Sequence, residues 1–341
     1  MRNKMKYQVA FLGCESWEED YILNKLSDKN ISKISFFPVL SKISDFKKII
    51  DFSIVSGFIN STFNEKHFSL LPNLKFLSTR STGYDHIDLI AAKKYGIKVS
   101  NVPLYGANTV AEHTFALLLA LARKIYPSIT RTKQSNFSLD NLRGFDLKGK
   151  SIGIIGTGSI GAHVVRLAHG FQMKILLYDI YKNRSLAKKY QANYVSLRQL
   201  LSRSDIITLH VPYNKKTHHL INQANIKLLK PGSYIINTSR GGLIETKALL
   251  KALVSGQLAG AGLDVLEEEG LIKEEIQLLD RQASREKLNT LLHDHILLKF
   301  DNVIVTPHNA FNSEEALRRI LDTTIENIKS FIAGRPINIV N

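Results

Sequence analysis

Short apolar runs recur along the chain and alternate with longer segments in which apolar residues are spaced three or four positions apart. A short apolar run bounded by turn residues is typical of a buried strand, whereas the longer spacing is typical of a helix that buries one face. In the first third of the chain, the pattern predicts strands at 7–12, 34–38, 49–57, 74–78 and 97–101. Strands that alternate with helices in this way predict a parallel sheet covered on both faces.

The same alternation resumes after residue 150 and predicts a second sheet. Its strands are expected at 151–155, 174–178, 205–211, 234–237, 258–263 and 303–306. Between the two groups of strands lies an apolar helix that is expected to end near Ile125. Thr109 and Glu112 have the spacing of a capping box, which places the start of this helix at Thr109.

The C-terminal part of the chain has two further features. Residues 267–299 are charged and lack a regular apolar period, which predicts an irregular functional excursion or a covering flap. A last amphipathic helix is expected to follow a cap at Asn312 or Ser313.

The segment S-I-G-I-I-G-T-G-S-I-G at 151–161 has three glycines at the spacing of a dinucleotide-binding loop. In that motif Gly156 permits a tight turn, Gly158 lets the backbone approach a pyrophosphate, and Gly161 allows close packing of the following helix. The next expected strand ends in Asp179, whose carboxylate can accept hydrogen bonds from ribose hydroxyls. Glycines at this spacing also occur in ordinary turns, but the succession of strand, glycines, helix and terminal aspartate favours a nucleotide site.

Composition narrows the class of protein. At 341 residues the chain is long enough for about two domains. Its one cysteine excludes an intramolecular disulfide and a multi-cysteine metal site, and suits the cytoplasm. The net charge of +16 is spread over scattered lysines without a basic stripe, so neither nucleic acid nor a membrane is expected as a partner. The longest apolar stretch, 115–122, falls far short of the roughly 20 residues that span a bilayer.

Six motifs together resemble the NAD-dependent D-isomer-specific 2-hydroxyacid dehydrogenases, and within them the D-lactate dehydrogenase-like branch. They are R-S-T-G-Y-D-H-I-D, V-P-L-Y-G-A-N-T-V-A-E-H, G-I-I-G-T-G-S-I-G, N-T-S-R-G-G-L-I, G-A-G-L-D-V-L-E-E-E and T-P-H-N-A-F. The resemblance implies a Rossmann-type doubly wound parallel sheet domain at 106–308. This NAD-binding domain would be inserted in a smaller flavodoxin-like α/β substrate domain formed by 1–105 and 309–341. A homodimer is expected.

Reduction of a 2-keto acid needs a cation for the carboxylate and a proton donor for the carbonyl oxygen. Arg240 offers a planar fork of donors suited to the first task, and His308 is the expected acid. By resemblance, Glu269 would hydrogen-bond His308 and favour its protonated form. The family usually has proline after this glutamate whereas Gly270 follows here, so Glu267 and Glu268 remain competitors for the role.

The resemblance also assigns binding residues. The backbone N–H groups of Thr82 and Gly83 would hold the substrate carboxylate, and Tyr105 would line the pocket. No metal is expected, because hydride transfer to nicotinamide needs none. The expected cofactor contacts are Gly156, Gly158, Ser159, Ile160, Gly161, Asp179, Val211, Pro212, Thr217, Thr238 and Asp264. The family often has a larger basic or imidazole side chain where Ser159 stands, so helix amides are expected to provide more of the phosphate contact here.

The implied activity is reversible hydride transfer between NADH and a 2-keto acid, with pyruvate and D-lactate as the expected pair. Two alternatives remain open at this point. One is a dehydrogenase for a bulkier 2-keto acid. The other is an NAD(H)-sensing regulator, because the C-terminal-binding-protein corepressors share this fold and most of these motifs.

Overall fold

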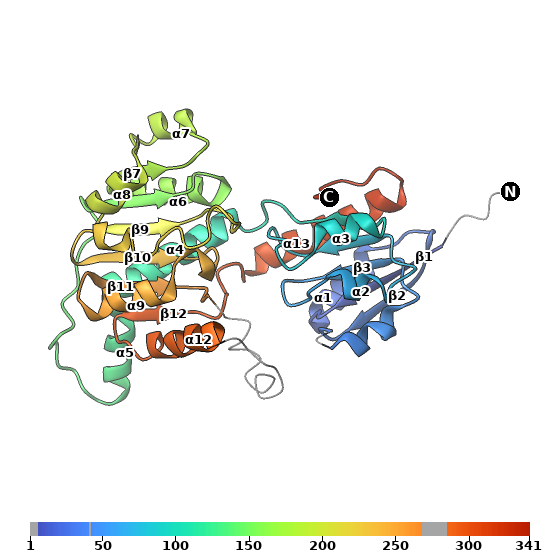
Figure 1. Ribbon diagram of the computed structural model, residues 1–341, viewed down its shortest axis with the longest axis horizontal. Helices are drawn as coiled ribbons and strands as arrows, with labels where there is room; N and C mark the ends of the chain where they lie inside the picture. Colours follow the sequence, from blue (N-terminus) through green and yellow to red (C-terminus); the bar gives the residue numbers. More distant parts are fainter. Residues whose placement is uncertain (1–5, 41, 268–284) are drawn as a thin grey trace. The chain divides into compact units, whose positions relative to one another are not determined.

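The computed structural model describes residues 6–40, 42–267 and 285–341. The chain forms two compact units, one made of residues 1–105 and 313–341 and the other of residues 106–312 (Figure 1). Each unit is built on a parallel sheet, which confirms the predicted α/β class. The second unit extends to residue 312 rather than to 308, because the backbone N–H groups of Asn309 and Ala310 bind the Asp264 side chain within that unit.

The described part of the first unit contains a five-stranded parallel sheet in the order β2-β1-β3-β4-β5. This is the order of a flavodoxin-like sheet. The strands are β1 (Tyr7–Leu12), β2 (Ile31–Phe37), β3 (Ile54–Gly57), β4 (Phe76–Thr79) and β5 (Lys98–Ser100). The helices are α1 (Ser16–Lys25), η1 (Ile43–Ile49), α2 (Glu65–Phe68), α3 (Leu89–Lys94) and α13 (Glu314–Ile332).

Strand β1 explains why both faces of this sheet are covered. Successive side chains of a strand point to opposite faces. Val9 and Phe11 pack in the cluster that contains residues of α1 and α13, whereas Ala10 and Leu12 pack in the cluster that contains residues of η1, α2 and α3. All four are fully buried, as expected for a strand inside a two-sided α/β layer.

The described part of the second unit contains a seven-stranded parallel sheet in the order β12-β11-β10-β9-β6-β7-β8. The strands are β6 (Ser151–Ile155), β7 (Lys174–Tyr178), β8 (Asn193–Tyr194), β9 (Ile206–Leu209), β10 (Ser233–Asn237), β11 (Leu258–Leu263) and β12 (Val303–Val305). From β6 the chain builds outward through β7 and β8, then returns to the other side of β6 at β9. The order therefore reverses between β6 and β9, and open α/β sheets bind ligands beyond the carboxyl ends of such strands.

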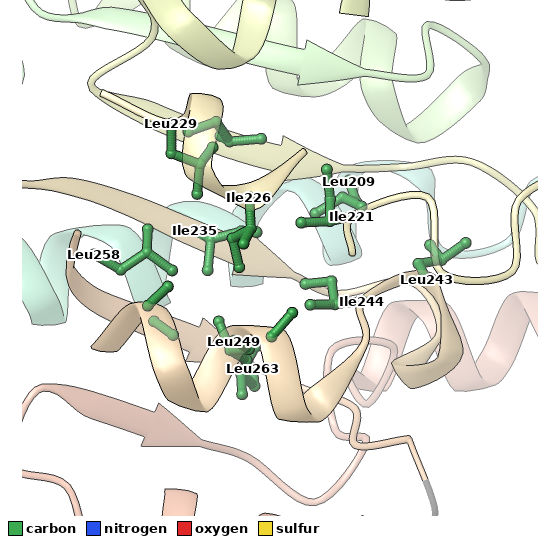
Figure 2. Close-up of a cluster of buried hydrophobic side chains, with 14 of the residues drawn as sticks. Leu209, Ile221, Ile226, Leu229, Ile235, Leu243, Ile244, Leu249, Leu258 and Leu263 are labelled. Carbon is green, nitrogen blue, oxygen red and sulfur yellow. The ribbon is translucent and has the colours of Figure 1, made fainter. Parts of the chain in front are cut away.

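Helices cover both faces of this sheet as well. They are α4 (Ala107–Ala122), α5 (Ile125–Lys133), α6 (Ser159–Gly170), α7 (Arg184–Lys189), α8 (Leu197–Arg203), η2 (Ile226–Leu228), η3 (Gly241–Leu243), α9 (Thr246–Val254) and α12 (Arg285–Leu297). Ile154 packs with residues of α4 and α6, whereas its neighbour Ile155 packs on the other face with residues of α8 and α9. Figure 2 shows part of the second cluster, in which side chains of β9, β10, β11 and α9 meet.

The predicted start of the apolar helix at Thr109 is wrong. Helix α4 begins at Ala107 after Gly106, so Thr109 lies inside the first turn and is buried. The helix ends at Ala122, and Lys124 (φ 54°) reverses the backbone before α5. Pro127 does not interrupt α5, because it lies in the first turn of that helix, where a backbone N–H would have no helical hydrogen-bond acceptor.

Two predictions for the C-terminal part have different outcomes. The irregular excursion is wrong for residues 285–297, which form α12, and residues 268–284 lie outside the described residues. The cap of the last helix is Ser313, whose Oγ accepts a hydrogen bond from the N–H of Ala316. None of the helices in the described ranges has both the length and the apolar character needed to cross a membrane.

Candidate active site

The glycine loop follows β6 at the point where the strand order reverses. Gly156 has φ +95°, and a Cβ there would lie 2.5 Å from the carbonyl oxygen of His210. A Cβ on Gly161 would lie 2.0 Å from the carbonyl oxygen of Gly156. At Gly158, in contrast, a Cβ would meet no atom within 4 Å. The loop therefore packs tightly on the protein side and leaves open space at Gly158, in front of the first turn of α6 formed by Ser159 and Ile160.

Asp179 is held at the end of β7 beside this loop. Its Oδ2 accepts hydrogen bonds from the backbone N–H (2.6 Å) and the hydroxyl (3.0 Å) of Thr157, and its Oδ1 accepts one from the N–H of Tyr181 (2.9 Å). An ionised carboxylate can accept about four hydrogen bonds. The carboxylate therefore has a fixed orientation and retains the capacity to accept a further hydroxyl donor.

The segment after β9 forms the other side of the reversal point. Thr217 stabilises it, because its hydroxyl donates to the carbonyl of Pro212 at 2.7 Å. The carbonyl of Val211 accepts a hydrogen bond from the Ser239 hydroxyl, also at 2.7 Å. Val211, Pro212 and Thr217, the expected cofactor contacts of this segment, therefore lie in one loop that these hydrogen bonds hold in place.

His210 is a residue of this region that sequence reasoning missed. Its Nε2 lies 2.8 Å from the Thr208 hydroxyl, while its Nδ1 is buried and has no hydrogen-bond partner among the described residues. Burial lowers the pKa of His210 to about 3, so the ring is neutral at physiological pH. The only signal in the sequence was its position directly after a buried strand.

Asp264 organises the turn that carries His308. The Asp264 side chain is 1% exposed and accepts hydrogen bonds from the Thr306 hydroxyl (2.5 Å), the N–H of Asn309 (2.8 Å) and the N–H of Ala310 (2.9 Å). The N–H of His308 donates to the Asp264 carbonyl at 2.8 Å. These contacts hold His308 half-buried at φ 55°, a backbone conformation that side chains other than glycine adopt infrequently.

A histidine from a distant helix completes this arrangement. His113 of α4 lies 3.0 Å from the Thr306 hydroxyl and 3.5 Å from the Asp264 carboxylate. Burial acts to raise the pKa of Asp264, but the hydrogen bonds from His113, Thr306 and the backbone outweigh it, so the pKa is lowered. The carboxylate is therefore ionised, and Asp264 binds the 306–310 turn in addition to any contact with a cofactor.

Arg240 follows β10, the strand beside β11 in the sheet. Its carbonyl accepts a hydrogen bond from the Asn237 side chain at 2.9 Å, and its half-buried guanidinium donates to the carbonyl of Ser239 at 2.9 Å. Thr238 is buried, with its hydroxyl 2.9 Å from that of Thr114 in α4. Arg240, Asp264 and His308 thus follow the carboxyl ends of three neighbouring strands, β10, β11 and β12.

In the first unit, the turn after β4 presents two backbone N–H groups. The hydroxyl of Thr82 donates to the carbonyl of Val102 (2.9 Å), the carbonyl of Thr82 accepts from Asn101 (2.8 Å), and the carbonyl of Gly83 accepts from Ser81 (2.6 Å). Among the described residues, nothing accepts a hydrogen bond from the N–H of Thr82 or Gly83. Two fixed donors at a strand end suit an anion. Tyr105, the last residue of this segment, is half-buried.

Of the three glutamates considered as partners of His308, Glu268 and Glu269 lie outside the described residues. Glu267 is described and binds elsewhere, with Oε1 2.5 Å from Nε2 of His219 and Oε2 3.0 Å from the N–H of Thr246. Residues 6–40, 42–267 and 285–341 contain no group of three His, Cys, Asp or Glu side chains placed to hold a metal ion.

Comparison with known proteins identifies related chains. Residues 115–310 match the family described as D-isomer specific 2-hydroxyacid dehydrogenase, NAD binding domain. The D-lactate dehydrogenase of Escherichia coli K12 is 33% identical over 332 residues, which cover 96% of this chain and 97% of that protein. An aromatic 2-oxoacid reductase of Clostridium sporogenes is 40% identical over 263 residues, 76% of each chain. The structure of a D-lactate dehydrogenase from Aquifex aeolicus, complexed with NAD and lactic acid, has a TM-score of 0.87 and 37% identity, and the match covers 97% of this chain and 98% of that chain.

Proposed function

Because the chain belongs to the D-isomer specific 2-hydroxyacid dehydrogenase family, as its motifs predicted, and is therefore an NAD-dependent oxidoreductase, we propose that it is a D-lactate dehydrogenase. It would reduce pyruvate to D-lactate with NADH and catalyse the reverse reaction. The observation that carries this proposal is the match to D-lactate dehydrogenases over nearly the whole length of both chains.

The residues of the glycine loop fit the cofactor. The open space at Gly158 and the N–H groups of the first α6 turn, at Ser159 and Ile160, would receive the pyrophosphate. Asp179 would accept a ribose hydroxyl with its remaining capacity, and Val211, Pro212 and Thr217 would surround the adenosine. Thr238 and Asp264 would orient the nicotinamide. When bound, the reduced nicotinamide supplies the hydride.

Charged and polar groups of the chain would bind the substrate and exchange a proton with it. The Arg240 guanidinium would bind the substrate carboxylate and the adjacent carbonyl oxygen in a bidentate way. The N–H groups of Thr82 and Gly83 would donate to the carboxylate, and Tyr105 would line the pocket. His308 would give a proton to the carbonyl oxygen as negative charge develops there, and would take it back in lactate oxidation. Glu269 is proposed as the partner that favours the protonated form of His308.

A panel of 2-keto acids tests the choice of substrate. We expect pyruvate to have a higher kcat/KM with NADH than a branched 2-keto acid or phenylpyruvate. The bulkier substrate class is the second candidate, because an aromatic 2-oxoacid reductase is 40% identical to this chain. If kcat/KM is at least tenfold higher for phenylpyruvate than for pyruvate, the bulkier 2-keto acids become the proposed substrate class. Negligible turnover of every keto acid, together with NADH-dependent binding of a protein partner, would favour the regulatory alternative.

We also propose that the chain forms a homodimer through the α5 region. Helix α5 and the loop after it expose five large apolar side chains, Ile125, Tyr126, Ile129, Phe137 and Leu139. Phe137 and Leu139 are 78% and 82% exposed, and the Arg131 guanidinium holds their loop by donating to the carbonyls of Ser138 and Asp140. Exposed apolar patches of this kind mark association surfaces. Light scattering should give the mass of a dimer, which Phe137→Ser with Leu139→Ser should halve; a wild-type monomer would refute the proposal.

We also propose a cytoplasmic location, because a chain with a single cysteine cannot form the intramolecular disulfides that are common outside the cytoplasm. The one cysteine is Cys14, which is half-buried. Its thiol sulfur accepts a hydrogen bond from the Arg80 guanidinium at 2.6 Å. Burial raises its pKa to about 11, against the opposing charge of Arg80, so the thiol is protonated and poorly reactive. Cell fractionation tests the location, and recovery of the activity outside the cytoplasmic fraction would contradict it.

A further inference from the structure

We propose that His219 and Glu267 form a clamp that positions Arg240, so that both act as positioning residues in keto-acid reduction. The inference rests on the proposed role of Arg240 as the carboxylate-binding residue. The clamp encloses the Arg240 turn, which consists of Arg240, the cap of η3, and the first two residues of η3, Gly241 and Gly242.

The turn is packed closely on both sides, and at Gly241 the neighbour is backbone, so only glycine fits there. A Cβ on Gly241 would lie 2.0 Å from the backbone carbon and oxygen of Leu266, and a Cβ on Gly242 would lie 2.7 Å from the ring of Tyr213. Real Cβ atoms do not approach other atoms so closely. The segment that ends in Glu267 therefore forms one flank of the turn, and the segment from Tyr213 to His219 forms the other.

A side-chain contact joins the two flanks. Nε2 of His219 lies 2.5 Å from Oε1 of Glu267, and the backbone N–H of His219 donates to the carbonyl of Gly242 at 2.8 Å. The two side chains are 29% and 15% exposed, which shields the contact from water more than a surface ion pair is shielded. His219 thus binds the turn through its backbone and the opposite flank through its ring.

The second oxygen of Glu267 extends the contact to the next helix. Oε2 accepts a hydrogen bond from the N–H of Thr246, the first residue of α9. The residues between the turn and this helix are anchored in the core: the N–H of Ile221 donates to the carbonyl of Leu243 at 3.0 Å, and Ile221 pairs with Ile244 (Figure 2). The residues that follow the Arg240 turn are therefore attached to the core, and Glu267 binds both the opposite flank, through His219, and the start of α9, through Thr246.

The ring of His219 is itself held in place. It stacks on the ring of His218 with 3.7 Å between centroids, and Nδ1 of His218 lies 3.0 Å from the Tyr213 hydroxyl. The chain of contacts from Tyr213 through both histidines to Glu267 thus surrounds the turn. Loss of the contact between His219 and Glu267 removes the link between the two flanks, so the backbone that carries Arg240 is held less firmly in its binding position.

The test is a double-mutant cycle of His219→Asn and Glu267→Gln. Asparagine suits the left-handed backbone of His219 (φ 49°) but is too short to reach Glu267. Glutamine keeps an oxygen for the N–H of Thr246, so the start of α9 is preserved. Glu245→Gln is the matched control, because it removes a carboxylate beside the same helix start that acts on His219 through its charge alone and hydrogen-bonds Gln223 instead of the ring.

We expect His219→Asn to lower kcat/KM for the keto acid by about tenfold or more, chiefly through a higher KM, while the Kd of NADH changes less than twofold. Glu267→Gln should have a smaller effect in the same direction, because an amide can still hydrogen-bond the imidazole. The double variant should be no worse than His219→Asn, because both changes act on the same contact, which His219→Asn already removes.

Two outcomes would overturn the clamp. One is a lowered melting temperature with an unchanged KM, since this would make the contact merely structural. The other is strictly additive effects on KM. Arg240→Lys is measured in the same series to separate this proposal from the one on which it rests. An unchanged KM in that variant would refute the role of Arg240 itself.

Discussion

Replacement of Asp264 by asparagine should release the turn that carries His308. The carboxylate accepts three hydrogen bonds shorter than 3 Å from this turn, from the Thr306 hydroxyl and from the N–H groups of Asn309 and Ala310. An asparagine side chain has one oxygen with two lone pairs, and its NH₂ group is a donor. At least one of the three donors therefore loses its acceptor and faces another donor.

The size of the effect follows from these contacts. A buried donor left without a partner costs about 1–3 kcal/mol. The two remaining bonds change from a charged to a neutral acceptor, at about 0.5–1 kcal/mol each. The turn is then destabilised by roughly 2–5 kcal/mol. The loss affects catalysis to the extent that it displaces His308 and so raises the activation free energy. An increase of only about 1.4 kcal/mol lowers kcat/KM about tenfold.

Two measurements check this prediction. Hydrogen–deuterium exchange of a peptide that spans 305–312 should become faster in Asp264→Asn, and stopped-flow NADH absorbance should show slower keto-acid reduction. Asp205→Asn is the matched control, because it makes the same chemical change in the same sheet, where the carboxylate binds Ser151 and Lys230 instead. The control should retain the rate. Unchanged exchange and an unchanged rate in Asp264→Asn would refute the proposed role of this aspartate in holding His308.

Three further predictions concern single residues. His308→Ala should lower the rate of hydride transfer by about 10²- to 10⁴-fold; a loss below threefold in single-turnover kinetics would contradict the role of His308 as the acid. Asp179→Ser should raise the ratio of kcat/KM with NADPH to kcat/KM with NADH at least tenfold, because the carboxylate repels a 2′-phosphate. Two cations, Lys182 and Arg184, follow Asp179 in the sequence, and equal wild-type use of both cofactors would show that their attraction for the phosphate outweighs this repulsion. Burial raises the pKa of Asp205, but hydrogen bonds from Lys230 and Ser151 outweigh it and hold the pKa at about 2, below the usual 3.8. Its stabilising contribution is then present above about pH 3.8 and lost as the pH falls towards 2, so wild type should lose more thermal stability than Asp205→Asn between pH 5 and pH 2; equal losses would contradict this.

Features encoded in adjacent residues were predictable from the sequence. The glycine loop at 156–161, the strand before it and Asp179 are linked by local spacing, and the structure places them beside the point where the strand order reverses. The two parallel sheets followed from the period of apolar runs. The short strand β8 was missed, because two residues carry too little pattern to be distinguished from a turn.

Contacts between distant residues were not predictable. His113, Asp264 and Thr306 meet only because α4 packs against the sheet next to β11 and β12, and nothing in the local sequence of any of them indicates the other two. The contact between His219, after β9, and Glu267, after β11, depends in the same way on the position of these two strands on either side of β10. Thr109 misled the prediction of a helix start, because its spacing to Glu112 fits a capping box while the backbone already turns into the helix after Gly106.

The identity of the product formed from pyruvate tests the proposed activity most directly. Purified protein is incubated with pyruvate and a limiting amount of NADH, and the lactate is resolved by chiral chromatography. We predict one D-lactate formed for each NADH consumed, with hardly any product from Arg240→Lys or His308→Ala. Formation of L-lactate, or no consumption of NADH with pyruvate by the wild-type protein, would contradict the proposed activity.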